Sequence, residues 1–301
     1  SQVSFPRENI NILLTEGIAE SAVALLKQSG YTSVTRLTHA PKADELAELL
    51  STTHLLGIRS RTEITPAVLE HAPKLFGVGC FCIGTNQVDL DACAARGIPV
   101  FNAPFSNTRS VAELTIASII HLMRGVPEKN HAAHNGVWQK SAAGSHEVRG
   151  KKLGIVGYGN IGSQLSVLAN ALGMEVYFFD TDTKLPHGNA RSVAALEELY
   201  QLADVLTYHV PETPQTKHMV NDAALAAMKD GVHIINYARG SLIDIDALVA
   251  ALTSGKVAGA AIDVFPSEPA SNDHEFISPL REFPNVLLTP HIGGSTQEAQ
   301  H

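Results

Sequence analysis

Short apolar runs alternate with amphipathic segments along most of the 301-residue chain. In the first third, the pattern predicts strands over residues 10–16, 54–60 and 74–80, and helices over residues 18–30 and 66–73. Strands that are apolar throughout are typical of sheets buried on both faces, and the segments between them carry apolar residues at helical spacing. This alternation predicts an α/β fold in which helices cover parallel sheets.

The pattern changes near residues 101–110, where the segment FNAPFSNTRS is rich in residues that favour turns and helix caps. A long helical pattern follows, and a second alternating block runs from residue 151 to about residue 290. We therefore predict a first domain over residues 1–105, rejoined by residues 291–301, and a second domain over residues 106–290. The last residues, TQEAQH, resemble the start of a helix that nothing caps, so we expect the sequence to be a fragment.

The composition is that of a globular, soluble protein, with 45% hydrophobic and 17% charged residues. A net charge of −8 argues against nucleic acid or an acidic membrane as partner. The chain contains no apolar stretch of about 20 residues and no signal-peptide core at its start. Its cysteines, Cys80, Cys82 and Cys93, are few and odd in number, which favours the cytoplasm. No second Cys or His cluster at zinc spacing accompanies them, so we expect buried thiols and no metal.

A glycine-rich loop, GYGNIG, lies between the predicted strand LGIVG and a predicted helix. Gly157, Gly159 and Gly162 have the spacing of a dinucleotide-binding loop, in which the helix amino terminus receives the phosphates. The next predicted strand, VYFFD, ends in Asp180, whose carboxylate suits the ribose hydroxyls and repels a 2′-phosphate. The sequence therefore predicts NAD rather than NADP. The glycines alone also fit a nucleotide-binding methyltransferase or an ordinary turn.

Three polar residues follow predicted strands in the second block: Arg239 after HIINYA, Glu268 after AAIDV and His291 after NVLLTP. Ligands bind at the carboxyl ends of parallel strands, so we expect the three to share one edge. A histidine that titrates near neutral pH can move the proton of a 2-hydroxy acid, and a carboxylate beside it raises its pKa. An arginine can hold the substrate carboxylate by two parallel bonds.

Each of these residues also has an ordinary structural interpretation. His291 is one of 14 histidines, and Glu268 can be a solvated loop residue. Arg239 can cap a helix or pair with Asp244.

Two further arginines, Arg59 and Arg61, lie two positions apart at the end of the predicted strand HLLGIRS. In an extended segment, side chains two positions apart leave the same face. Two guanidinium groups on one face can hold a phosphate, although a solvated basic edge is the alternative.

Several segments together resemble the D-2-hydroxyacid dehydrogenase family: GYGNIG, INYARGSLID, AGAAIDVFPSEP, NVLLTPHIGGSTQEAQ and CFCIGTNQVDLDACAARGIPVFNAPFSNTRSVAEL. The resemblance covers nearly the whole chain. It implies two doubly wound parallel-sheet domains, a Rossmann-like NAD domain inserted into a flavodoxin-like substrate domain. It further implies oxidation of 3-phospho-D-glycerate to 3-phosphohydroxypyruvate, the first step of L-serine biosynthesis. Reduction of another 2-keto acid, such as 2-oxoglutarate, and an NADH-sensing binding protein are the alternatives.

The resemblance also implies roles for individual residues. Arg239 orients the substrate, His291 transfers the proton, and Glu268 is its partner. The implied NAD contacts are Gly157, Gly159, Asn160, Ile161, Gly162, Asp180, Tyr237, Ala238, Arg239, Asp263, His291, Ile292, Gly293 and Gly294. The implied substrate contacts are Arg59, Arg61, Asn107 and Lys140.

Lys140 is expected to reach the site of a neighbouring subunit and Trp138 to anchor the interface, so a homodimer or homotetramer is implied. The resemblance also implies that near relatives continue beyond the position of His301 into a regulatory domain, and we expect this sequence to end before that domain.

Overall fold

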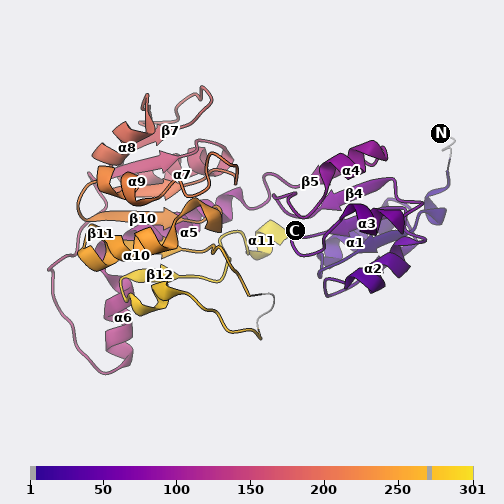
Figure 1. The fold of residues 1–301 in the computed structure, drawn as a ribbon, viewed down its shortest axis with the longest axis horizontal. Coiled ribbons are helices and arrows are strands. Elements are labelled where there is room, and N and C mark those ends of the chain that lie inside the picture. The colour runs from indigo at the N-terminus through magenta and orange to yellow at the C-terminus, as the bar shows by residue number, and fades with distance from the viewer. Residues whose placement is uncertain (1–4, 270–272, 301) are drawn as a thin grey trace. The chain divides into compact units, whose positions relative to one another are not determined.

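A computed structural model describes residues 5–269 and 273–300 and divides the chain into two compact units (Figure 1). Unit 1 comprises residues 1–107 and 296–301, and unit 2 comprises residues 108–295. Residues 1–4 and His301, which the sequence analysis assigns to the first domain, lie outside the described residues. Each unit contains one sheet with helices around it, and all strand pairings between named strands are parallel. The predicted α/β fold with two parallel sheets is confirmed.

Unit 1 contains a five-stranded sheet in the order β2-β1-β3-β4-β5, which is the flavodoxin-like order. The strands are β1 (Ile12–Leu14), β2 (Val34–Arg36), β3 (Leu55–Ile58), β4 (Gly77–Cys80) and β5 (Val100–Asn102). The helices are η1 (Arg7–Asn9), α1 (Glu20–Gln28), α2 (Ala43–Leu50), α3 (Pro66–Glu70), α4 (Leu90–Ala95) and α11 (Gln297–Gln300). Leu13 packs in one apolar cluster and its neighbours Ile12 and Leu14 in another, so β1 is buried on both faces.

Unit 2 contains a seven-stranded sheet in the order β12-β11-β10-β9-β6-β7-β8. The strands are β6 (Lys152–Val156), β7 (Glu175–Phe179), β8 (Arg191–Ser192), β9 (Val205–Tyr208), β10 (Val232–Asn236), β11 (Val257–Ile262) and β12 (Val286–Leu288). Counted from β6, this is the order 3-2-1-4-5-6 of dinucleotide-binding sheets, extended by one strand. The strand order reverses between β6 and β9, and such a switch point is where ligands bind in open α/β sheets.

Helices cover both faces of the unit 2 sheet, whereas α6 (Val126–His134) extends away from the sheet (Figure 1). The other helices of the unit are α5 (Thr108–Arg124), α7 (Asn160–Ala171), α8 (Leu196–Leu202), α9 (Asp222–Ala227), α10 (Ile245–Ser254), η2 (Gly240–Leu242) and η3 (Pro279–Glu282). Ile234 packs with α8, α9 and α10, whereas the next residue, Ile235, packs with α5 and α7. Since apolar side chains fill both faces, polar chemistry is confined to the loops at the ends of the strands.

Several predicted elements begin later or end earlier than their sequence patterns suggest. The predicted helix over residues 66–73 ends at Glu70, because Pro73 disfavours helical backbone in the residue before it. The predicted strand over residues 54–60 ends at Ile58, and the backbone then bends at Ser60 and Arg61. Within the described residues, no helix is both long enough and apolar enough to cross a bilayer.

Candidate active site

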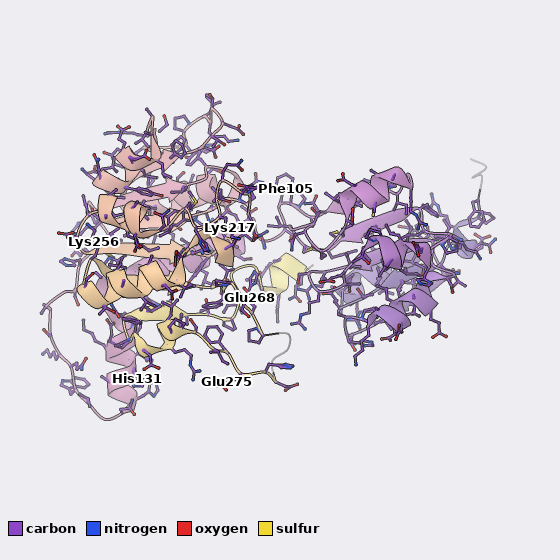
Figure 2. The ribbon with its side chains drawn as sticks, in the orientation of Figure 1. Phe105, His131, Lys217, Lys256, Glu268 and Glu275 are labelled. Carbon is purple, nitrogen blue, oxygen red and sulfur yellow. The ribbon has the colours of Figure 1, made fainter. Side chains whose placement is uncertain are left out.

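The carboxyl edge of the seven-stranded sheet carries the three polar residues singled out above. Arg239 follows β10, Glu268 follows β11 and His291 follows β12, and these strands are neighbours in the sheet. All three side chains line a pocket of about 480 Å³ that is built from unit 2 alone. The structure therefore brings together residues that are up to 52 positions apart in the sequence. Figure 2 shows Glu268 on this edge, with Lys217 on the same side of the unit.

His291 and Glu268 form a direct pair at this edge. The Nδ1 atom of His291 lies 2.8 Å from Oε2 of Glu268, and Oε1 of Glu268 accepts the backbone N–H of Phe265 at 3.1 Å. An ionised carboxylate only accepts hydrogen bonds, so Nδ1 carries a hydrogen. In neutral His291 the lone pair is therefore on Nε2, the ring nitrogen that Glu268 does not occupy. The pair fixes the tautomer that can accept a proton.

The same pair shifts the pKa of both groups. The hydrogen bond to Glu268 raises the pKa of His291 above its usual value, although burial and the charge of Arg239 oppose this shift. Burial alone would raise the pKa of Glu268. The hydrogen bond from His291 and the charge of His291 have a larger, opposite effect, so the pKa of Glu268 is below its usual value. The imidazolium form of His291 is thus stabilised by an ionised carboxylate, as proton transfer requires.

The backbone of His291 has a left-handed conformation, with φ at 54°. A non-glycine residue in this region is strained by about 1–2 kcal/mol. Asp263 holds the turn in place: its two carboxylate oxygens accept the N–H groups of Ile292 at 2.8 Å and Gly293 at 2.7 Å. The hydroxyl of Thr289 donates to the same carboxylate at 2.6 Å. Asp263 is only 1% exposed, so its carboxylate acts from beneath the turn.

Arg239 lies in the turn after β10, and the next position in this turn, residue 240, has room only for glycine. The buried carboxamide of Asn236 donates to the carbonyl of Arg239 at 2.8 Å and accepts the N–H of Ala238 at 3.1 Å. At the next position, a Cβ on Gly240 would lie 2.1 Å from the carbonyl carbon of Phe265, so no side chain fits there. Gly240 therefore allows the β10 turn to approach the segment that carries Glu268.

The alternative partner for Arg239, Asp244, has another role. Its side chain accepts the N–H groups of Asp246 and Ala247 and so caps α10. Asp244 also lies 3.9 Å from His218. The Nη1 atom of Arg239 donates to the carbonyl of Ala238 at 2.6 Å, and the guanidinium remains on the pocket wall.

The glycine loop between β6 and α7 has the geometry that a dinucleotide requires. Gly157 has a φ of 91°, and a Cβ on it would lie 2.4 Å from the carbonyl oxygen of His209. A Cβ on Gly162 would lie 2.1 Å from the carbonyl oxygen of Gly157, so helix and strand touch there. Gly159, in contrast, faces open space at the amino terminus of α7, where a pyrophosphate can approach the backbone.

Asp180 lies directly after β7, beside this loop. One carboxylate oxygen accepts the N–H of Tyr158 at 2.7 Å, and the other accepts the N–H of Asp182 at 2.9 Å. Each oxygen has a second lone pair, so the carboxylate can still accept bonds from ribose hydroxyls. The residues present therefore fit NAD.

Comparison with known proteins agrees with this geometry. Residues 116–293 match the family model described as D-isomer specific 2-hydroxyacid dehydrogenase, NAD binding domain. The chain belongs to the D-isomer specific 2-hydroxyacid dehydrogenase family. The predicted resemblance and the predicted NAD-binding domain are thereby confirmed, and the substrate of this dehydrogenase is a 2-hydroxy acid.

Relatives of this dehydrogenase include proteins of closely similar sequence. The D-3-phosphoglycerate dehydrogenases of Haemophilus influenzae and Escherichia coli are 60% and 57% identical to it over 300 residues. Each alignment covers 100% of this chain and 73% of the relative. Among solved structures, D-lactate dehydrogenase from Aquifex aeolicus complexed with NAD and lactic acid has a TM-score of 0.82 and 28% identity, covering 96% of this chain and 90% of that one.

The remaining residues implied as NAD contacts differ in whether their side chains or only their backbone atoms are available to a ligand. The ring of Tyr237 is buried in the core and its hydroxyl lies 2.6 Å from that of Ser118, so only its backbone is available to a ligand. Ala238 is buried as well, whereas Ile292 is 41% exposed. Asn160 and Ile161 form the first turn of α7, and Gly294 follows the turn that Asp263 holds. Their contacts with NAD stay predictions.

The residues implied as substrate contacts lie outside the pocket. Arg59, Arg61 and Asn107 belong to unit 1, where the carboxamide oxygen of Asn107 is buried without a hydrogen-bond partner among the described residues. Lys140 is exposed in the loop between α6 and β6. Their roles also stay predictions.

The pocket contains residues that the sequence analysis missed. Glu212, Lys217 and His218 line it from the loop after β9. The rule that located Arg239 also applies to them, because they follow the carboxyl end of a neighbouring strand. Among the residues with described coordinates, no group of three or more His, Cys, Asp or Glu side chains is placed to hold a metal ion.

Proposed function

We propose that this dehydrogenase oxidises 3-phospho-D-glycerate to 3-phosphohydroxypyruvate with NAD, the first step of L-serine biosynthesis. The observation that carries the proposal is its similarity, over the whole chain, to proteins named D-3-phosphoglycerate dehydrogenase. The pocket supports it, because an arginine and a carboxylate-backed histidine are what oxidation of a 2-hydroxy acid requires. The cysteines, which are few and odd in number, favour a cytoplasmic location.

His291, Glu268 and Arg239 each have a distinct task in this reaction. NAD supplies the acceptor for the hydride that leaves C2 of the substrate. Nε2 of neutral His291 takes the proton of the C2 hydroxyl, and Glu268 stabilises the imidazolium that results. The guanidinium of Arg239 binds the substrate carboxylate through two parallel hydrogen bonds and thereby orients C2.

We propose that the substrate phosphate binds to Arg59 and Arg61. Within the described residues, neither guanidinium forms an ion pair or a hydrogen bond, whereas Arg36 and Arg96 both donate to backbone carbonyls. The bend at Ser60 and Arg61 means that strand alternation alone does not place the two side chains on one face. The proposal is supported because the guanidinium groups of Arg59 and Arg61 are both available to bind an anion.

Turnover with a panel of phosphorylated and plain 2-hydroxy acids tests this proposal. Replacing Arg59 and Arg61 together with Ala is expected to raise the KM for 3-phosphoglycerate by roughly tenfold to a hundredfold, because charge-assisted hydrogen bonds are lost. The KM for an unphosphorylated 2-hydroxy acid should stay within about twofold. Arg149→Ala is the matched control, because that arginine pairs with Glu147 on an exposed surface.

The panel also separates the alternatives. Equal rises in KM for both substrate types would contradict the phosphate site. They would favour the alternative reaction, which is the reduction of a plain 2-keto acid such as 2-oxoglutarate. An absence of NADH absorbance changes with every substrate would favour an NADH-sensing binding protein.

The pH profile of oxidation depends on Glu268. Oxidation needs neutral His291, so activity rises as pH rises through the pKa of His291, which Glu268 raises. In Glu268→Gln that pKa falls, and the acid limb of kcat/KM should move to lower pH while the maximal rate decreases. Measurement of kcat/KM from pH 5 to 10 checks this, with Glu275→Gln, whose carboxylate pairs with Arg281, as the control. An acid limb that stays in place or moves to higher pH would contradict the assignment.

We propose that the chain pairs with a second copy of itself through the segment after α6. Trp138 is 85% exposed and Val137 is 51% exposed in this loop, more than their apolar surfaces favour in water. A second copy that covers Val137 and Trp138 would also bring Lys140 of this chain close to the substrate site of that second copy. Sedimentation velocity gives the mass in solution, and a monomer at all concentrations would contradict this pairing.

A further inference from the structure

Glu16 lies two residues after the end of β1 and has an uncommon backbone conformation. Its φ is 59°, and Gly17 after it has a φ of 67°. Glutamate has no intrinsic preference for this left-handed region, so the surroundings of Glu16 must hold it there. Backbone bonds contribute, since the N–H of Glu16 donates to the carbonyl of His39 at 2.9 Å and that of Gly17 to Leu37 at 2.9 Å. The turn aims the Glu16 side chain at the loop that follows β3.

The carboxylate of Glu16 accepts four hydrogen bonds from that loop. Oε1 accepts the backbone N–H groups of Arg59 at 3.1 Å and Thr62 at 2.8 Å, and also the hydroxyl of Thr62 at 2.7 Å. Oε2 accepts the N–H of Arg61 at 3.0 Å. β1 and β3 are adjacent in the sheet, so these bonds join neighbouring strand ends. Hydrogen bonds to an ionised acceptor are about twice as strong as neutral ones.

A second contact holds the same loop from another direction. The side-chain amide of Gln87 donates to the carbonyl of Arg59 at 2.7 Å. Thr62, at the end of the loop, is 1% exposed, whereas the guanidinium groups of Arg59 and Arg61 remain without partners among the described residues. The backbone of the loop is therefore fixed while its two cationic side chains are available to a ligand.

We propose that Glu16 is a positioning residue for recognition of the substrate phosphate. Its carboxylate sets the backbone positions from which Arg59 and Arg61 reach a shared anion, and it thereby determines the preference for phosphorylated over plain 2-hydroxy acids. This inference rests on the phosphate site of the proposed function. Glu16 does not touch the substrate, and its effect passes through the loop.

Glu16 has two opposite effects on the affinity for the substrate phosphate, so a change in the KM shows which effect is larger. Its negative charge repels a nearby phosphate, so removal of the charge alone would tighten phosphate binding. Its hydrogen bonds hold the arginines in place, so removal of the anchor would weaken binding. A rise in the KM for the phosphorylated substrate on neutralisation therefore identifies the anchor as the dominant effect.

The substitution Glu16→Gln tests the inference. Gln has an NH₂ group in place of one acceptor oxygen and therefore cannot accept all four bonds. We expect the KM for 3-phosphoglycerate to rise about tenfold, while kcat and the KM for an unphosphorylated 2-hydroxy acid stay within about twofold. Hydrogen exchange should become faster at the amides of Arg59, Arg61 and Thr62.

The control is Glu63→Gln, which removes the same charge from the same stretch of chain, where Glu63 is exposed and forms no interaction among the described residues. Its KM for 3-phosphoglycerate should be unchanged or lower. If Glu16→Gln does not fold, Thr62→Val removes one of the four donors at nearly constant volume and should raise the same KM about threefold.

The outcomes separate this inference from the function on which it rests. If Arg59→Ala with Arg61→Ala lowers phosphate selectivity but Glu16→Gln or Thr62→Val does not, the role of Glu16 is wrong and the phosphate site stands. If the arginine variant also keeps its selectivity, the phosphate site itself is wrong.

Discussion

Replacing His291 with Ala is expected to lower kcat for 3-phosphoglycerate oxidation by roughly 10²–10⁴. Without the imidazole, the C2 hydroxyl proton has no acceptor held by the protein, and water must replace a base whose pKa Glu268 raises. The affinity for NAD should stay within about twofold, because the glycine loop and Asp180 lie at different strand ends.

Stopped-flow turnover together with NADH fluorescence titration measures both quantities. His218→Ala is a suitable control, because His218 lines the same pocket but pairs with Asp244 rather than Glu268. Normal turnover in the His291 variant would refute the acid–base assignment. Loss of NADH binding together with turnover would instead indicate that the left-handed turn at residue 291 had collapsed.

Replacing Arg239 with Ala is expected to reduce kcat/KM by about 30-fold to several thousandfold, which corresponds to the loss of about 2–5 kcal/mol of charge-pair binding. Arg239→Lys keeps the charge but loses the planar fork that matches a carboxylate, so its loss should be smaller but clear. The effect should fall on both kcat and KM, because a carboxylate held loosely leaves C2 misplaced.

Steady-state kinetics of the two Arg239 variants, compared with Arg281→Ala, provide the measurement. Arg281 pairs with Glu275 outside the pocket, so its loss should leave kcat/KM unchanged. Thermal unfolding should be nearly the same for all three variants, because Gly240 and Asn236, rather than the guanidinium, shape the β10 turn. Equal kcat/KM in Arg239→Ala and the unmodified protein would remove Arg239 from substrate recognition.

The alternation of apolar and amphipathic segments was sufficient to predict two parallel sheets covered by helices. Local chemistry explains this success, since the spacing of apolar residues reflects the element that buries them. The roles of Gly157 and Gly162 could also be predicted from the sequence, because the spacing of the glycines between a strand and a helix is a local pattern. The structure agrees, since neighbouring atoms leave no room for a side chain at either position. The predicted strand end was less accurate at Ser60 and Arg61. There the chain bends, and the backbone N–H groups of Arg59 and Arg61 donate to Glu16, which lies 43 or more positions earlier.

The grouping of Arg239 and His291 followed from the rule that strand carboxyl ends form one edge. Their individual roles did not follow, because each residue alone had an ordinary structural interpretation. The 2.8 Å contact between His291 and Glu268 decides the tautomer and the direction of both pKa shifts. Asp263 shows the same limit, since only the folded turn reveals that its carboxylate supports the backbone after His291.

By itself, the sequence determined the class of fold, the dinucleotide loop and the strand ends at which polar chemistry lies. These depend on spacing within a few residues, which backbone geometry translates directly into strands, helices and turns. Only the tertiary structure decided which of these strand ends are neighbours, which carboxylate meets His291 and that Glu16 holds the loop of Arg59. Such contacts join segments far apart in the chain, and their bonds exist only once the sheet has fixed the register of its strands.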